Sequence, residues 1–192
     1  MNSAKIRKEY SLVLHPSIEI IDKVAALKAK LTTKIRKYAS RDSVAHVTII
    51  KFLASQKELI IIEKKIEMFC NSQKQQKVIF NRLISSKKSR TIFVIPDESS
   101  KTYLKNLLDD FQKRLKTRCT KSGGEAHISI GRKLSSTQID LAQNLFGPVT
   151  LKFNCDTVAI RRFSKNAGQF EVIKTFKFLE NSLIDSQYSL FD

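Results

Sequence analysis

The spacing of apolar residues divides the chain into segments of two kinds. Apolar residues recur three and four positions apart, as in an amphipathic helix, in four segments at roughly 18–38, 56–70, 100–118 and 137–145. Runs typical of strands occupy 10–14, 44–53, 78–84, 91–95, 126–130 and most of 149–179. Because strands occur both singly between helices and in adjacent pairs, the pattern predicts an α+β fold rather than a doubly wound parallel sheet.

The order of these segments repeats along the chain. Each half contains a helix, a strand with a histidine, a second helix and a hairpin, without a residue-by-residue repeat. A chain of 192 residues suits one domain, or two small lobes that share a core. We therefore expect a single bilobal domain over residues 1–180, followed by a flexible polar tail over residues 181–192.

The net charge of the chain indicates which kinds of molecule it is suited to bind. Lysine and arginine outnumber aspartate and glutamate by 35 to 18, which gives a formal net charge of +17. A surplus of this size attracts polyanions, with nucleic acid as the first candidate and an anionic membrane as the second. A basic surface without any polyanionic partner is the alternative that charge alone leaves open.

Apolar runs and cysteines set further limits. No apolar run approaches the length that spans a bilayer, and the first residues lack the apolar region of a signal peptide, so we expect a cytoplasmic protein with no membrane partner. The three cysteines are widely spaced, which indicates neither a disulfide framework nor a zinc site. No histidine or acid cluster has the spacing of metal ligands, so we expect no metal ion or other cofactor. We also expect a monomer.

Two of the three histidines occupy the same local pattern, in which a histidine, an apolar residue, a hydroxyl residue and an apolar residue follow one another. The two strings are His-Val-Thr-Ile at 46–49 and His-Ile-Ser-Ile at 127–130. Alternation along a strand puts each histidine on the same face as its hydroxyl partner, while the apolar residues point into a core. The alternative is a pair of histidines at the edge of the core whose neighbouring hydroxyls satisfy the backbone.

This pairing suits the cleavage of a phosphodiester. The reaction needs a base to activate the attacking oxygen and an acid to protonate the leaving oxygen, and two histidines can do both near neutral pH. One histidine must be neutral and the other protonated, which predicts a bell-shaped pH profile. The hydroxyls of Thr48 and Ser129 can donate hydrogen bonds to the non-bridging phosphate oxygens. The chemistry requires no metal ion.

The paired motifs, about eighty residues apart, resemble those of the two-histidine (2H) phosphoesterase superfamily, most closely its bacterial 2′-5′ RNA ligase-like branch. The resemblance covers about residues 10–179 and includes the continuations Ile-Lys-Phe at 50–52 and Gly-Arg at 131–132. It implies two lobes with mixed or antiparallel sheets around a central cleft and helices outside. It also implies an enzyme in which His46 and His127 are catalytic and Thr48 and Ser129 bind phosphate.

The resemblance also implies a reaction. Members typically hydrolyse a cyclic phosphodiester, such as the 2′,3′-cyclic phosphate of RNA or of a nucleotide, and leave a 2′-phosphate; some catalyse reversible 2′-5′ ligation. Two positions depart from the common pattern. Ser129 stands where threonine is common, but serine keeps the hydrogen-bond donor. Glu125 stands where proline is often found, and either lies in a loop or orients His127.

Other residues are candidates for lining the substrate site. Phe52 shares the face of His46 if the strand stays regular, and can stack on a base or belong to the core. Tyr10 begins the first strand and is a second candidate for the cleft.

Basic residues supply the other candidates. Arg132 reaches the face of His127 only if the strand ends or bulges near Gly131. Arg161 and Arg162 lie in a late strand, where one of them is a candidate for a phosphate contact. His15 matches neither motif and is interpreted as a loop residue.

A non-catalytic function is the main alternative to an enzyme. A nucleic-acid-binding module that kept the fold would show salt-dependent RNA binding without turnover. The presence of both motifs favours the enzyme, because a binding module has no need of two histidines placed for proton transfer.

The last six residues indicate a second kind of partner. Gln187, Leu190 and Phe191 have the spacing of the peptide with which bacterial proteins bind the sliding clamp. Leu190 and Phe191 would fill an apolar pocket while Gln187 bonds at its rim. The alternative is that the apolar pair folds back on the protein's own surface. A clamp-associated accessory protein is therefore a further hypothesis.

Deletion of residues 187–192 tests the tail. We expect the full chain, but not the truncated chain, to co-elute with a sliding clamp in size-exclusion chromatography. The double substitution of Leu190 and Phe191 by alanine should have the same effect, because it removes the apolar anchors. Unchanged co-elution after the deletion would show that this tail is not the tether.

Overall fold

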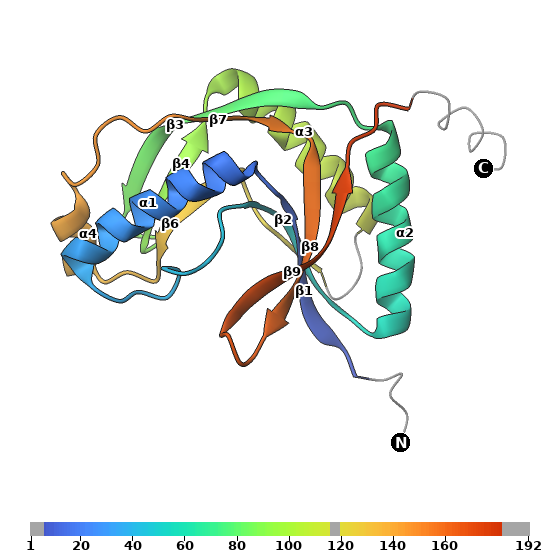
Figure 1. The fold of residues 1–192 in the computed structure, drawn as a ribbon, viewed down its shortest axis with the longest axis horizontal. Coiled ribbons are helices and arrows are strands. Elements are labelled where there is room, and N and C mark those ends of the chain that lie inside the picture. Colours follow the sequence, from blue (N-terminus) through green and yellow to red (C-terminus); the bar gives the residue numbers. More distant parts are fainter. Residues whose placement is uncertain (1–5, 116–119, 182–192) are drawn as a thin grey trace.

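The computed structural model describes residues 6–115 and 120–181, which fold into two antiparallel sheets with helices packed around them (Figure 1). The five-stranded sheet has the order β5-β2-β1-β8-β9 and the four-stranded sheet has the order β6-β4-β3-β7. The strands are β1 (Lys8–Leu14), β2 (Val47–Ala54), β3 (Gln76–Ser86), β4 (Thr91–Pro96), β5 (Thr120–Ser122), β6 (Ile128–Arg132), β7 (Leu151–Cys155), β8 (Thr157–Ser164) and β9 (Gln169–Lys177). The predicted α+β fold is confirmed, except that the short polar strand β5 was not predicted.

Helices α1 (Ile18–Ile35), α2 (Gln56–Ser72), α3 (Glu98–Leu115) and α4 (Ser136–Ala142) occupy the four segments predicted as helical. Two of them start at a capping box, in which a serine side chain and the glutamate or glutamine three residues later satisfy each other's backbone N–H groups, at 55–58 and 135–138. α1 packs on α4 and the four-stranded sheet, α2 packs on the five-stranded sheet, and α3 contacts both sheets. No helix in the described ranges is long and apolar enough to cross a membrane.

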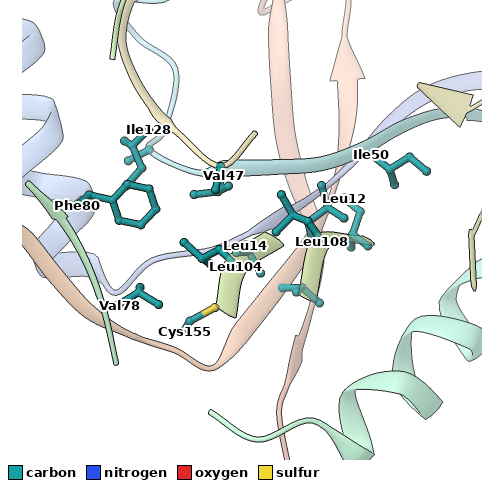
Figure 2. Packing of buried hydrophobic residues seen from close by; sticks show 14 of the residues in the cluster. Leu12, Leu14, Val47, Ile50, Val78, Phe80, Leu104, Leu108, Ile128 and Cys155 are labelled. Carbon is teal, nitrogen blue, oxygen red and sulfur yellow. The ribbon is translucent and has the colours of Figure 1, made fainter. Parts of the chain in front are cut away.

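One apolar core joins the two sheets. It includes Leu12 and Leu14 of β1, Val78 and Phe80 of β3, and Leu104 of α3, each completely buried (Figure 2). Because α3 contributes to the same cluster as strands of both sheets, the two halves of the chain share their hydrophobic interior. Cys70 and Cys155 are buried free thiols within this core.

Each strand that follows a histidine contains one extra residue. In β2 the pairing with β1 passes from Thr48 to Ile50 and leaves Ile49 without a cross-strand partner. In β6 the pairing with β4 passes from Ser129 to Gly131 and leaves Ile130 unpaired in the same way. A bulge of one residue shifts the alternation of every later side chain to the opposite face.

The bulges determine which side chains lie on the same face of the sheet as the motif hydroxyls. Directly paired residues share a face of the sheet. Lys51 pairs with Ser11, which lies two positions from Val13, the partner of Thr48, so Lys51 and Thr48 share a face. By the same rule Arg132 shares the face of Ser129 in the other sheet. The bulge that the sequence required for Arg132 to reach this face is therefore present.

A close backbone contact links the two motif segments. Gly123 follows β5, which pairs with β2, and lies four residues before His127. Its N–H donates to the carbonyl of Ile49 at 2.9 Å, and a Cβ at this position would lie 1.9 Å from the carbonyl oxygen of Thr48. Only glycine can therefore approach the first motif this closely.

Substitution of Gly123 by alanine should push the Thr48 backbone aside. We expect a loss of stability of about 1–3 kcal/mol or more, as for an overpacked interior, measured by urea unfolding. Gly147→Ala is the matched control, because a Cβ there meets no heavy atom within 4 Å. Equal stability of the two variants would contradict the proposed role of the close contact.

Candidate active site

The two motif histidines stand at equivalent places in the two sheets. His46 directly precedes β2, and His127 directly precedes β6. In each, Nδ1 lies within hydrogen-bond distance of the carbonyl oxygen two residues earlier, at 2.6 Å from Val44 and 2.8 Å from Glu125. A carbonyl only accepts, so Nδ1 is assigned the proton and Nε2 remains for proton transfer.

The residues between and after the histidines alternate as predicted. Val47, Ile49, Ile128 and Ile130 are at most 1% exposed and belong to the core. The histidines and the hydroxyl residues Thr48 and Ser129 are half-buried. Because the apolar residues occupy the core face, the histidines and hydroxyls are left on the opposite face of each strand.

Arg161 of β8 lies directly beside the first motif. It pairs with Ser11 across β1, which places it on the same face as Thr48 and Lys51. Its Nη1 lies 3.0 Å from Nδ1 of His46, and its Nη2 lies 3.5 Å from the hydroxyl oxygen of Ser11. Because the shorter contact directs the Nδ1 proton to Val44, and a guanidinium only donates, the contact between Arg161 and His46 is a charge contact in this tautomer and not a hydrogen bond. The guanidinium also lies over the Phe170 ring, 5.4 Å from the ring centroid. Of the two arginines proposed from the sequence, Arg161 is thus the one at the site.

The side chain of Arg161 is buried but keeps its charge. The residue is 5% exposed, and burial, with the nearby charge of Arg132, lowers its pKa to about 10. Its Nε has no hydrogen-bond partner among the described residues. Arg162, the next residue along β8, is exposed.

His46 is held in its neutral form. Its pKa is lowered well below the ordinary value of 6.5, first because the surrounding residues desolvate the ring and second because the Arg161 guanidinium faces it. Lys28 and Arg132 act in the same direction from other elements, and the carbonyl of Val44 opposes them. At neutral pH this histidine is therefore ready to accept a proton.

His127 has different neighbours. Its ring meets the ring of Phe93 edge to face, with the centroids 5.5 Å apart, and Phe93 is the cross-strand partner of Ser129. The backbone carbonyl of Glu125 bonds to the ring, whereas its side chain is exposed. The Glu125 carboxylate therefore does not orient His127. The backbone carbonyl of this residue makes the contact, and any residue at position 125 would supply it.

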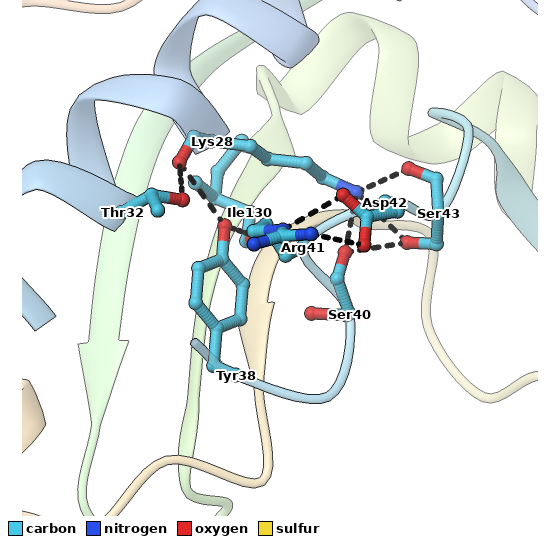
Figure 3. A network of polar contacts seen from close by, with 8 residues as sticks. All are labelled: Lys28, Thr32, Tyr38, Ser40, Arg41, Asp42, Ser43 and Ile130. Carbon is cyan, nitrogen blue, oxygen red and sulfur yellow. Dashed lines mark hydrogen bonds and ion pairs between the residues drawn. The ribbon is translucent and has the colours of Figure 1, made fainter. Parts of the chain in front are cut away.

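A buried lysine holds the loop that leads to His46. Nζ of Lys28 donates to the carbonyl of Ser40 at 3.0 Å, and to the carbonyl and hydroxyl oxygens of Ser43 (Figure 3). The hydroxyl of Ser40 accepts from the N–H of Arg132 at 2.9 Å, and the Tyr38 hydroxyl lies 3.3 Å from the carbonyl of Ile130. The loop before the first motif is therefore bonded to the strand of the second.

The structure corrects two of the substrate-lining predictions. Tyr10 and Phe52 are 2% and 3% exposed, belong to the core and stack on each other with their ring centroids 5.5 Å apart. Phe52 points inward because the bulge at Ile49 reverses the alternation that the prediction assumed. His15 lies in the loop after β1, as predicted, but it is half-buried and its Nδ1 has no hydrogen-bond partner among the described residues.

Two further predictions concern the C-terminal tail and the absence of a metal ion. The tail residues Gln187, Leu190 and Phe191 lie beyond the described residues. Within 6–115 and 120–181, no three histidine, cysteine, aspartate or glutamate side chains gather as metal ligands would.

Three residues at the site were not identified from the sequence. Lys28 lies on the buried stripe of Ile20, Val24 and Leu31 in α1, although lysine is usually an exposed residue. Its position in that stripe was the available signal. The sequence pattern gave no such signal for Lys51 and Gly123. The position of Lys51 depends on the bulge in β2, and that of Gly123 depends on the pairing of β5 with β2.

The backbone as a whole is similar to several solved structures, one of which is described as a phosphoesterase. E. coli LigT in complex with 3′-AMP matches with a TM-score of 0.63 and 13% identity, over 90% of this chain and 99% of LigT. The protein TT0787 of Thermus thermophilus matches with a TM-score of 0.60 and 17% identity, over 92% and 100%. Usb1 of Kluyveromyces marxianus gives 0.52 and 14%, over 88% and 98%.

These similarities establish the fold. The chain has the two-sheet α+β fold of LigT, which is the fold that the predicted resemblance implied. No family model and no curated protein matches the sequence.

Removal of the Lys28 ammonium tests its role as an anchor. We expect Lys28→Met to destabilise the fold by about 1–3 kcal/mol, because buried acceptors lose their donor, as measured by urea unfolding. Burial lowers the pKa of Lys28 to about 8. Wild type therefore gains stability from this group as pH rises from about 8 towards the unfolded value of 10.5, and the deficit of the variant should grow over that window.

The control is Lys30→Met, since Lys30 lies on the same helix but is exposed. If both variants unfold at the same urea concentration, Lys28 does not anchor the loop.

Proposed function

We propose that this protein is a phosphodiesterase that acts with two histidines rather than a metal ion. The observation that carries the proposal is the duplicated arrangement of His46 with Thr48 and of His127 with Ser129. In both, the Nδ1 proton is directed to a backbone carbonyl and Nε2 remains available. A structural role at the edge of the core would not require the same tautomer twice.

The arrangement supports general acid–base catalysis on a phosphodiester. One histidine takes a proton from the attacking oxygen while the other gives a proton to the leaving oxygen. The hydroxyls of Thr48 and Ser129 share the histidine faces, where they can donate to the non-bridging oxygens of the phosphate. Lys51 and Arg132, which the bulges bring to the same faces, add positive charge where the phosphate charge must be held.

The proposed substrate is a cyclic phosphodiester, the 2′,3′-cyclic phosphate of RNA or of a nucleotide, which is opened to a 2′-phosphate. If the 5′-hydroxyl of a second strand attacks the cyclic phosphate in place of water, the same step gives 2′-5′ ligation. The net charge of +17 favours a polyanionic substrate such as RNA. E. coli LigT has been solved with 3′-AMP, with NADP+ and with ATP, which supports a nucleotide ligand for this fold.

Substitution of either motif histidine should abolish turnover. With 2′,3′-cyclic nucleotides and EDTA, we expect wild type to be active and His46→Ala and His127→Ala each to lose about 10²–10⁴-fold in kcat, the usual contribution of an acid or base. The measurement is product formation by chromatography, with circular dichroism to confirm the fold.

The third histidine supplies the matched control, and His15→Ala should stay within a few-fold of wild type because it lies outside both motifs. High activity in either motif variant would refute the assignment. Salt-dependent RNA binding without turnover on any cyclic or 2′-5′-linked substrate would instead favour the non-catalytic binding module.

A further inference from the structure

The two histidines have the same tautomer but different electrostatic surroundings. Nδ1 of His46 is contacted by a guanidinium at 3.0 Å, whereas the ring neighbour of His127 is the uncharged ring of Phe93. The motifs themselves do not explain this difference, because both have a cation five residues after the histidine, at Lys51 and Arg132. The difference comes from Arg161, which belongs to neither motif.

Arg161 is a cation without a compensating carboxylate. Among the described residues no acid forms an ion pair with it, although it is 5% exposed and its Nε is unpartnered. Burial of an unpaired charge is costly, so a residue kept in this state indicates a functional role. The hydroxyl of Ser11 and the ring of Phe170 hold the guanidinium without neutralising it, so its positive charge is retained beside His46.

We infer that Arg161 is a positioning residue that assigns the proton-transfer roles, so that His46 is the general base and His127 is the general acid. The inference rests on the proposed function and adds to it the direction in which the proton moves. Arg161 acts through His46 and does not itself exchange a proton with the substrate.

The groups around His46 act almost entirely against its protonation. Arg161 from β8, Lys28 from α1 and Arg132 from β6 are all cations, and each lowers its pKa. The one opposing group is the carbonyl of Val44, which bonds to the Nδ1 proton that both protonation states carry. The neutral ring is thus the resting form, with a free lone pair on Nε2.

The hydrolytic step then follows with all protons accounted for. Nε2 of His46 takes a proton from water as the water oxygen forms a bond to phosphorus. The bond from phosphorus to O3′ breaks, and Nε2 of protonated His127 gives its proton to O3′. The product is a 2′-phosphate, and solvent restores the two histidines to their starting states.

The first test measures the protonation of His46 without using catalysis. NMR titration of the free protein should show His46 titrating at a higher pH in Arg161→Gln than in wild type, because a positive neighbour is removed. Arg161→Lys keeps the charge and should leave His46 close to wild type. Arg162→Gln is the matched control on the same strand, and it should change nothing because Arg162 is exposed.

The kinetic counterpart is the acid limb of the pH profile of kcat/KM, which reports the base in the free enzyme. In Arg161→Gln this limb should move to higher pH, so that kcat/KM at the acid end falls by about tenfold or more. At higher pH, where the base is deprotonated in both proteins, kcat should stay near the wild-type value. A raised KM at every pH with an unmoved limb would show that Arg161 binds phosphate instead, and would overturn the inference.

A second test separates acid from base. A nucleoside phosphodiester with a 4-nitrophenolate leaving group needs no proton from the enzyme, so His127→Asn should lose less than about tenfold on it, while His46→Asn should keep the full loss of about 10²–10⁴-fold. The opposite pattern would reverse the roles and sink the inference while leaving the proposed function intact. Full activity in both variants would instead remove the proposed function itself.

Discussion

The arrangement of the site depends on a single extra residue in each of two strands. Without the bulge at Ile49, strict alternation would turn Lys51 towards the core and Phe52 towards the motif face. Without the bulge at Ile130, Arg132 would leave the face of Ser129. The same device in both sheets keeps the cation five positions after each histidine on the face of the hydroxyl two positions after it.

A second constraint keeps the two motif strands together although they belong to different sheets. Gly123 bonds to the strand of the first motif and continues within four residues to the second. On the other side, the loop held by Lys28 reaches the second strand through the Ser40 hydroxyl and the N–H of Arg132. The relative position of the motifs is thus determined by the backbone hydrogen bond of Gly123, by the bonds of the Lys28 and Ser40 side chains and by a shared core.

What could be predicted from the sequence is what depends on local pattern. The helices, most strands and the faces of the two motifs follow from periodicity. Of the two places open to Phe52, the core is the one observed, and the sequence could not decide between them because a bulge leaves no local signature. The choice between Arg161 and Arg162 was impossible, because it depends on how β8 pairs with β1. Long-range register is the common element in these failures.

The contact between Arg161 and His46 also bears on reversibility. Ligation, in which a 5′-hydroxyl replaces water as the attacking group, begins like hydrolysis with His46 neutral and His127 protonated. By microscopic reversibility, re-formation of the cyclic phosphate must begin with His46 protonated and His127 neutral. The Arg161 guanidinium disfavours protonation of His46, so it favours the opening of the cyclic phosphate over its re-formation. A buried arginine outside both motifs would thus decide which direction of a symmetric-looking site is kinetically ready, and replacing that one residue could reverse the preference without touching either motif.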